Sequence, residues 1–342
     1  MRLLDRPQVD IDLGDSLDYL TDRRVLVTGA AGSIGSEICR TLLSGGSQRI
    51  YAMDHDENGL YELAQELGER IIPVLGDITD GAFLGYIMGR LKADVVFHCA
   101  AYKHVPILEA NPAVAVLNNV FGTRLVAAAS PRTVLVSTDK AVEPSSVYGH
   151  TKRIAEDIVL TSGGTVVRFG NVLDSRGSVL PMFRRQIAAG GPVTVTSPSA
   201  ERYFMAIPEA AALVLKAGGV GEAGMLYTLD MGEPVNIRAL ALEMIGGWDI
   251  EIEYIGLRPG EKEHEKLHAD DETVEYGYPK INKVTRKSRE PHPILIEKLW
   301  QFCHDQGKKG GGDSVDTRYI DASARTADRS AERFYEIIGE WS

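Results

Sequence analysis

Tyr148 and Lys152 are the pair in this sequence best suited to acid–base chemistry. On a helix, positions i and i+4 share a face, so the two side chains would project together. A lysine ammonium lowers the pKa of a nearby phenol, and a phenolate near neutral pH is a base for a hydroxyl proton. Thr138 is expected to hydrogen-bond the same hydroxyl. Because an exposed tyrosine and lysine on an amphipathic helix is a common arrangement, the rest of the chain must support this interpretation.

A glycine-rich segment near the N-terminus predicts a dinucleotide site. Gly29, Gly32 and Gly35 follow a β-branched apolar run and open a helical segment. Gly29 permits a tight turn, Gly32 lets the backbone approach a pyrophosphate, and Gly35 allows the helix to pack closely on the sheet. The free N–H groups at the start of this helix favour phosphate.

An acidic residue after the second expected strand distinguishes between cofactors. Asp54 follows Gly35 by 19 residues, which is close to the spacing of an acid that binds the adenosine ribose. Its charge repels a 2′-phosphate, so NAD is expected rather than NADP. Asp77, after the third expected strand, is expected to reach the adenine. A glycine-rich turn that only packs a helix is the alternative, but strand, glycines, helix and acid occur here in order.

The elements that must position these residues alternate as β-α-β units. The expected strands are short apolar runs: Arg24–Thr28, Arg49–Met53, Ile71–Leu75, Asp94–His98, Thr133–Ser137 and Thr165–Phe169. Helix-length segments lie between them: Ser33–Ser44, Glu57–Glu69, Pro112–Ala129 and Val147–Leu160. This alternation predicts an α/β fold with a doubly wound parallel sheet (Rossmann), whose ligands bind beyond the carboxyl ends of the strands.

We expect two lobes from the 342 residues, since domains average ~150 residues. Residues 1–172 are expected to form an NAD-binding Rossmann domain with an N-terminal extension at 1–22. Residues 173–342 are expected to form mainly a smaller C-terminal α/β substrate lobe, with some segments returning to the Rossmann domain. Shorter runs expected in this lobe are Val193–Thr196, Met225–Leu229 and Glu251–Ile255.

Composition narrows the range of partners. Lysine and arginine total 37 against 48 aspartates and glutamates, a formal charge of −11, which argues against nucleic acid and anionic lipid. A local basic pocket for a phosphorylated small molecule remains open. The three cysteines are widely spaced, which suggests neither a disulfide framework nor a zinc site. With no leader-like or bilayer-length apolar run, a soluble cytoplasmic protein without membrane insertion is predicted.

The chain resembles the polysaccharide-biosynthesis branch of the extended short-chain dehydrogenase/reductases, in particular the UDP-N-acetylglucosamine 4,6-dehydratases. The resemblance runs from about residue 2 to residue 281 and rests on these motifs: Val25–Glu37, His98–Pro106, Asn119–Thr123, Ser137–Lys140, Tyr148–Arg153, Arg168–Val172, Ser175–Val179, Gly191–Thr196, Arg202–Ala210, Leu229–Val235 and Leu257–Lys262. Leu3–Pro7 resembles the segment that joins membrane helices to the catalytic domain in long members. Those helices are not in this sequence, so a soluble short form is expected.

The resemblance implies a three-step reaction. Tyr148 takes the proton of the sugar's C4 hydroxyl while NAD takes the C4 hydride. The resulting ketone acidifies C5, whose proton is removed by Lys140 as a neutral amine. Asp139, in its protonated form, donates to the departing C6 hydroxyl, and hydride returns to C6 to give a 4-keto-6-deoxy sugar.

The resemblance also implies the members of each site. The expected catalytic residues are Thr138, Asp139, Lys140, Tyr148 and Lys152. The expected cofactor-binding residues are Gly29, Gly32, Ser33, Ile34, Gly35, Asp54, Asp77, Ile78, Ala100, Ala101, Asn119, Tyr148 and Lys152. The UDP-sugar is expected at Lys103, Asn171, Arg202, Arg258 and Glu261. A homo-oligomer is usual for the superfamily and is expected here.

The sequence departs from the branch at four positions. Tyr148 stands where many long members carry methionine. Asp174, Glu201 and His264 are unusual for the branch and lie near the expected substrate pocket. These three residues leave the exact sugar open.

An NAD-dependent UDP-sugar epimerase, acting at C4 or C5 on UDP-N-acetylglucosamine or UDP-glucuronic acid, is the main alternative. It would use Tyr148 and Lys152 in the same way. Elimination needs an acid and a base, as in Asp139 and Lys140, whereas C4 epimerisation needs neither. An NAD-binding sensor without turnover is disfavoured by the intact catalytic set.

Two further motifs match unrelated enzymes. His264-Glu-Lys-Leu-His268 has the spacing of zinc proteases, but no third ligand is evident, so no metal is expected. Ser137-x-x-Lys140 has the spacing of some acyl-transfer enzymes, whose partner motifs are not found.

Overall fold

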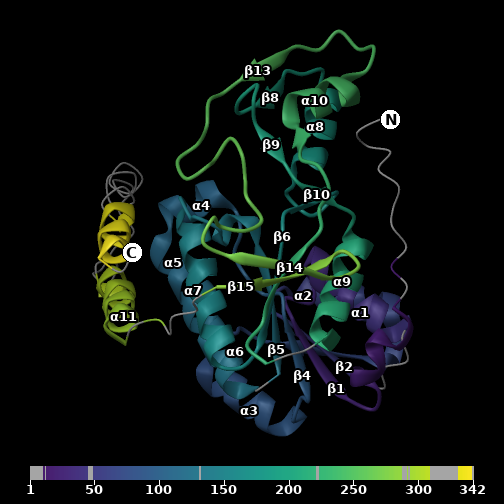
Figure 1. Cartoon of the computed structure of the whole chain (residues 1–342), viewed down its shortest axis with the longest axis vertical. Coiled ribbons are helices and arrows are strands. Elements are labelled where there is room, and N and C mark those ends of the chain that lie inside the picture. The colour runs from purple at the N-terminus through teal and green to yellow at the C-terminus, as the bar shows by residue number, and fades with distance from the viewer. Residues whose placement is uncertain are drawn as a thin grey trace.

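The computed structural model describes residues 11, 13–44, 49–130, 132–220, 223–286, 291, 293–308 and 330–340. It confirms the predicted fold class, a layered α/β arrangement around one large sheet (Figure 1). The segment Leu3–Pro7, predicted to resemble a membrane-proximal linker, lies outside the described residues.

The large sheet has nine strands in the order β14-β15-β11-β6-β5-β4-β1-β2-β3. Their bounds are β1 (Arg24–Thr28), β2 (Arg49–Asp54), β3 (Ile71–Leu75), β4 (Val95–His98), β5 (Thr133–Thr138), β6 (Thr165–Phe169), β11 (Leu226–Leu229), β14 (Thr273–Tyr278) and β15 (Ile281–Thr285). The first seven in chain order are parallel, and the β15 and β14 pairings are antiparallel. Val25, Leu26 and Val27 are fully buried, as expected for a parallel strand covered on both faces.

Helices cover both faces of this sheet (Figure 1). One apolar cluster joins it to η1 (Gly14–Leu20), α1 (Ser33–Ser44), α2 (Glu57–Leu67) and α9 (Ile207–Val220). Other clusters join it to α3 (Gly81–Leu91), α4 (Val105–Ala110), α5 (Pro112–Ala115), α6 (Thr123–Ala129) and α7 (Val147–Thr161). Short turns are η2 (Gly68–Arg70) and η4 (Asp139–Ala141).

The expected single helix at Pro112–Ala129 is three consecutive helices, because a π-helical segment, η3 (Val116–Gly122), separates α5 from α6. Such segments are rare and frequent at functional sites. This stretch is the one candidate membrane span among the described residues, and 56 % of it is buried inside the protein. A core helix meets the same length and hydropathy test, and residues such as Ala115 and Val120 are fully buried.

A second, smaller apolar core lies beyond the sheet. It joins α8 (Val179–Ala188) and α10 (Ile237–Ile245) to the strand pair β8 (Val193–Val195) and β13 (Ile252–Tyr254). Two further pairs are β7 (Asn171–Val172) with β10 (Phe204–Met205), and β9 (Glu201–Arg202) with β12 (Val235–Asn236). The run Met225–Leu229, expected in the smaller lobe, instead forms β11 in the large sheet, parallel to β6.

The C-terminal part returns to the first half of the chain. α11 (Pro293–Lys308) and the helical residues 330–339 pack against α5, η3 and α7 through Leu299, Phe302 and Phe334. Figure 1 shows them beside α5. The division of the chain at residue 172, a cytoplasmic location and a homo-oligomer stay predictions.

Candidate active site

The turn between β1 and α1 is built so closely that two positions require glycine. Gly29 has φ +69°, and a Cβ there would lie 2.6 Å from the backbone nitrogen of Ala100. A Cβ at Gly35 would lie 2.2 Å from the carbonyl oxygen of Gly29. Helix α1 therefore starts against the carboxyl ends of β1 and β4, which directs its free N–H groups to the same edge of the sheet.

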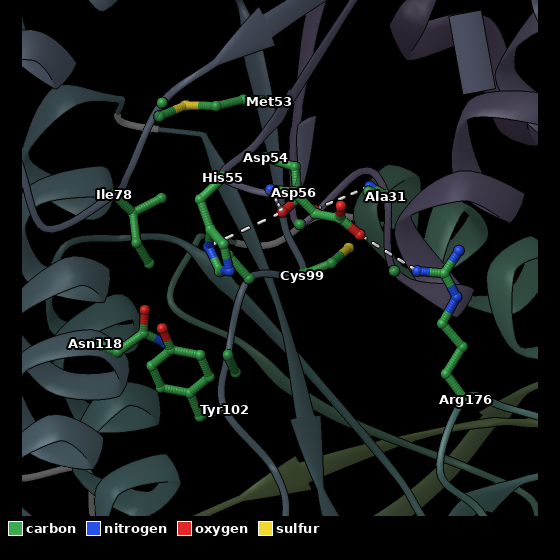
Figure 2. A pocket seen from close by; sticks show the side chains of 15 residues that line it. Ala31, Met53, Asp54, His55, Asp56, Ile78, Cys99, Tyr102, Asn118 and Arg176 are labelled. Carbon is green, nitrogen blue, oxygen red and sulfur yellow. Dashed lines mark hydrogen bonds and ion pairs between the residues drawn. The ribbon is translucent and has the colours of Figure 1, made fainter. Parts of the chain in front are cut away.

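A cavity of about 260 Å³ opens at this edge (Figure 2). Asp54, at the end of β2, accepts a hydrogen bond from the Ala31 N–H at 2.9 Å and one from the Asp56 N–H at 3.0 Å. Its carboxylate is thereby fixed at the wall of the cavity. A helix N-terminus, glycine backbone and an oriented acid fit the pyrophosphate and ribose of a dinucleotide.

The cavity contains part of the predicted cofactor set. Six predicted residues line it: Gly29, Gly32, Asp54, Ile78, Ala100 and Ala101. The others lie outside its lining: Ser33, Ile34, Gly35, Asp77, Asn119, Tyr148 and Lys152. Asp77 is exposed and accepts hydrogen bonds from the N–H and hydroxyl of Thr79. Lining residues that sequence reasoning missed are Ala31, Met53, His55, Asp56, Gly76, Cys99, Tyr102, Asn118 and Arg176.

Asn119, predicted to bind the cofactor, is a structural clamp in this state. Its Nδ2 donates to the carbonyl of Tyr102 at 3.0 Å and to Thr151 Oγ1 at 3.1 Å. Its Oδ1 accepts from the Tyr102 N–H at 2.9 Å and from Asn118 at 3.0 Å. With both amide hydrogens and both acceptor positions used, the side chain ties the loop after β4 to helix α7.

Arg176 reaches the cavity from the loop after β7. Its backbone N–H donates to Ser33 Oγ at 3.1 Å, and its guanidinium lies 3.4 Å from Asp56 Oδ2. Figure 2 shows this side chain on one side of the cavity, directed toward Asp56. The motif Ser175–Val179 was a signal that this loop belongs to the site.

Helix α7 places Tyr148 and Lys152 on one buried face. Its first turn is capped by Ser146, whose side chain accepts from the Gly149 N–H. Burial raises the pKa of the Tyr148 phenol to about 12, although the charge of Lys140 and the Thr138 hydroxyl act to lower it. Burial lowers the pKa of Lys152 to about 8, and its Nζ donates to the carbonyl of Val136 at 2.8 Å. The cation that lowers the pKa of the phenol is thus Lys140, not Lys152 as expected.

Lys140 is an ammonium held by oxygen atoms. Its Nζ lies 3.0 Å from Asp139 Oδ1, 3.3 Å from Asn171 Oδ1 and 3.5 Å from Glu265 Oε1. Burial lowers the pKa of Lys140, but the carboxylates of Asp139 and Glu265 outweigh it and the net pKa is raised. Lys140 is therefore charged in the protein without ligands, and the neutral Lys140 expected beside the bound cofactor stays a prediction.

Asp139 is completely buried beside these groups. Its Oδ1 accepts from the Thr138 hydroxyl at 2.9 Å and from Lys140. Its Oδ2 has no hydrogen-bond partner among the described residues. A Cβ at Gly170 would lie 3.2 Å from this oxygen, so the glycine keeps space in front of it.

The predicted substrate residues are only partly gathered. Asn171 contacts Lys140 directly. The pKa of Lys103 is lowered, mainly by burial and in addition by the charge of Lys140. Arg202 donates to the carbonyls of residues 201, 262 and 263 at 2.6 to 2.9 Å, so it anchors a loop with the groups expected to bind substrate. Arg258 and Glu261 contact each other in that loop, where the Arg258 N–H donates to Glu261 Oε2 at 3.3 Å.

The unusual residues of this sequence are paired. Asp174 accepts from Arg184 at 2.5 Å, and the His264 ring lies 3.2 Å from Glu201 Oε2. The stretch from His264 to His268 is irregular rather than helical, so its two imidazoles do not share a helix face. Among the described residues no group of three or more histidines, cysteines or carboxylates is arranged for a metal ion.

A buried ion network lies beneath the catalytic residues. Arg168 on β6 donates to both oxygens of Glu156 on α7 and to both oxygens of Glu272, at 2.7 to 3.0 Å. Arg286 donates to Glu156 at 2.6 Å and to Asp157 at 2.5 Å. The Ser137 hydroxyl also donates to Glu156, at 2.6 Å. The network joins α7 and the end of β5 into one rigid support.

The family described as "Polysaccharide biosynthesis protein" matches residues 25–286 of the chain. The chain is 46 % identical over 323 residues to the capsular polysaccharide biosynthesis protein CapD of Staphylococcus aureus, covering 87 % of this chain and 54 % of that protein. It therefore spans about half the length of this relative. It is 32 % identical over 272 residues to the UDP-glucose 4-epimerase of Rickettsia rickettsii, covering 73 % and 79 %.

Two solved structures show the same fold. Pen from Bacillus thuringiensis superposes with a TM-score of 0.73 at 32 % identity, covering 79 % of this chain and 90 % of that one. The Bordetella bronchiseptica enzyme WbmH, solved in complex with NAD+, superposes with a TM-score of 0.59 at 25 % identity, covering 69 % and 87 %.

Proposed function

The chain belongs to the polysaccharide biosynthesis protein family, and from this we propose that it is an NAD-dependent nucleotide-sugar 4,6-dehydratase. Its substrate in this proposal is UDP-N-acetylglucosamine or a related UDP-sugar, and its product is the 4-keto-6-deoxy sugar. The coarser class is the short-chain dehydrogenases/reductases that dehydrate or epimerise nucleotide sugars, and one relative is named a UDP-glucose 4-epimerase.

NAD is the cofactor of this proposal. The start of α1 would hold its pyrophosphate, and the oriented carboxylate of Asp54 would hold its adenosine ribose. When bound, NAD accepts a hydride from the sugar and returns it. The Asp54 charge at the cavity wall disfavours the 2′-phosphate of NADP.

The residues beside the cavity supply the proton transfers. Tyr148 accepts the proton of the C4 hydroxyl, which requires that ligand binding lower its pKa from about 12. Asp139 donates to the C6 hydroxyl through Oδ2, the oxygen that neither Thr138 nor Lys140 occupies. Lys140, once it has lost a proton, removes the proton at C5.

One observation carries this proposal: the buried carboxyl group of Asp139 binds Lys140 through Oδ1 and acts on the pKa of Tyr148, while its Oδ2 has no hydrogen-bond partner in the described part of the chain. Removal of water from C5 and C6 needs an acid and a base beside the C4 base. A C4 epimerase needs only the base at C4. Epimerisation is the second candidate function because the rickettsial relative is named a UDP-glucose 4-epimerase.

Proton NMR of the purified protein with UDP-N-acetylglucosamine and NAD in deuterated water tests the proposal. A new C6 methyl signal with deuterium at C5 is expected. An intact C6 hydroxymethyl group with a changed H4 coupling would replace the dehydratase by the epimerase. If the sugar is unchanged, UDP-glucuronic acid and UDP-glucose are the next substrates to test.

A further inference from the structure

Glu265 is a buried carboxylate for which the reaction above has no use. Its side chain is 3 % exposed, and its Oε1 lies 3.5 Å from Lys140 Nζ. Its Oε2 has no hydrogen-bond partner among the described residues. Burying a carboxylate oxygen without a hydrogen-bond partner lowers the stability of the fold. We therefore expect this oxygen to serve a function.

The loop that carries Glu265 is fastened on both sides. Before it, Arg202 binds the carbonyls of residues 262 and 263, and Lys262 Nζ donates to the carbonyl of Val142 at 2.9 Å. After it, Glu272 accepts from the Ala269 N–H at 2.9 Å and from Arg168. A carboxylate distant in sequence is thus delivered to a defined place beside Lys140.

Lys140 must lose a proton before it can act as a base, and the Glu265 carboxylate lies where it can accept that proton. Its three ammonium hydrogens face three oxygens, on Asp139, Asn171 and Glu265. A base for C5 needs a free electron pair, so one proton must first leave Nζ. A proton that moves from Lys140 to Asp139 is passed on to the departing C6 hydroxyl and leaves with the water, so Asp139 cannot return it to Lys140. The Asn171 amide oxygen is a poor proton acceptor. Of the three oxygens, only the one on Glu265 can hold the proton and give it back.

We propose, on the premise of the dehydratase function, that Glu265 is the proton acceptor for Lys140. One proton moves from Lys140 Nζ to Glu265 Oε1: an N–H bond breaks, an O–H bond forms, and a neutral amine is left beside a neutral carboxylic acid. The amine then takes the C5 proton and becomes an ammonium again. After hydride return, Lys140 gives a proton to C5: an N–H bond breaks and a C–H bond forms. Glu265 then returns its proton to the neutral Lys140. The proton that Tyr148 took from the C4 hydroxyl replaces the one that Asp139 gave to the departing water, so no further reactant is needed.

Glu265 acts through Lys140 and is therefore a positioning residue. The 3.5 Å separation must shorten by a few tenths of an ångström, as acid–base contacts do when substrate binds. Among the described residues, the other charged or titratable groups that face the pair are Asp139, Arg202 and Tyr148, all beside Lys140, and Lys103. Proton transfer from Lys140 to Glu265 leaves the total charge of the pair unchanged. This matters in a buried site, where an unpaired charge is strongly destabilising.

The test compares Glu265→Gln with Glu265→Asp and with the control Glu263→Gln, a change on the same loop whose carboxylate binds Ser197 and Ser199. Exchange of H5 with deuterated water is measured by NMR from pH 6 to pH 10, together with the near-ultraviolet absorbance of reduced nicotinamide. With E265Q the Lys140 proton has no neighbouring carboxylate to move to and must leave to water. H5 exchange should therefore fall roughly 100-fold at neutral pH, recover as pH rises, and leave cofactor reduction intact. E265D should restore part of the rate, and E263Q should match the wild type.

Other outcomes overturn the proposal. H5 exchange by E265Q that equals or exceeds the wild-type rate would make Glu265 a counter-ion only. Equal losses of H5 exchange and cofactor reduction, with no pH recovery, would make it structural.

A second measurement needs no turnover. The Nζ resonance of Lys140, assigned by its loss in Lys140→Met, should titrate at lower pH in E265Q than in the wild type. An unchanged midpoint would overturn the pairing even if the wild type forms the C6 methyl product. A lower midpoint in a protein that forms no such product would leave the pairing standing and remove the dehydratase function.

Discussion

Arg168 and Glu156 form a bidentate ion pair in which both side chains are completely buried, with 2.7 Å between each donor nitrogen and its oxygen. The pair joins β6 to the helix that carries Tyr148. Each charge is neutralised only by its neighbours in the network, because water does not reach it.

Replacing Arg168 should therefore be strongly destabilising. Arg168→Met leaves Glu156 and Glu272 without their shared partner, and breaking one side of a buried pair costs about 3–5 kcal/mol of unfolding free energy. Urea denaturation measures the loss. Arg40→Met, which removes the exposed pair with Glu66, should cost about 1 kcal/mol or less. Similar losses in the two variants would contradict the assigned role of the network.

Asp139→Asn should separate the two halves of the proposed reaction. The amide cannot donate the proton that the C6 hydroxyl needs, so formation of the C6 methyl product should fall by about 10² to 10⁴-fold. Cofactor reduction should persist, since Tyr148 is unchanged. Quantitative NMR and absorbance measure the two steps, with Asp270→Asn, at an exposed position, as the control. Product formation within threefold of the wild type would exclude Asp139 as the acid.

Asp54 should determine the choice between NAD and NADP. Asp54→Asn removes the negative charge but keeps the size and an acceptor for the Ala31 N–H. We expect the affinity ratio to shift toward NADP by about tenfold, roughly 1.4 kcal/mol. Calorimetric titration with each nucleotide checks this, and the exposed Asp270→Asn is the matched control. An unchanged ratio would mean that the ribose lies elsewhere.

Lys152 should make stability rise at alkaline pH. Its pKa is lowered by burial to about 8, against 10.5 for an ordinary lysine. Between these values the unfolded chain binds more protons than the folded protein, so stability increases with pH. The cost of burying the charge is fully present below pH 8 and is gone above about pH 10.5.

The comparison with Lys152→Met isolates this effect. The unfolding free energy of the wild type should gain on the order of 3 kcal/mol relative to K152M across that window. Urea denaturation at several pH values measures it. The exposed Lys92→Met keeps Lys152, so its pH curve should run parallel to that of the wild type. Parallel pH curves for wild type and K152M would contradict the lowered pKa of Lys152.

Local sequence patterns identified the first six strands of the large sheet but not their order, in which β1 lies between β2 and β4. The six expected strands recur within one residue of β1 to β6 at each end, since each is a short, mainly apolar run between helix-length segments or turns. β11 was nevertheless placed in the wrong lobe. A short apolar strand has the same pattern in any sheet, and only its pairing with β6 decides where it lies.

The sequence by itself determined the glycine turn, Asp54 and the shared face of Tyr148 and Lys152. These depend on spacing along one strand or helix, which backbone geometry translates directly into position. Only the tertiary structure decided the protonation state of Lys140 and the position of Glu265 beside it. It also decided the hydrogen bonds by which Asn119 and Arg202 hold their loops. A side chain's charge depends on its burial and on its neighbours. Glu265, which lies beside Lys140, is more than a hundred positions away from it in the chain.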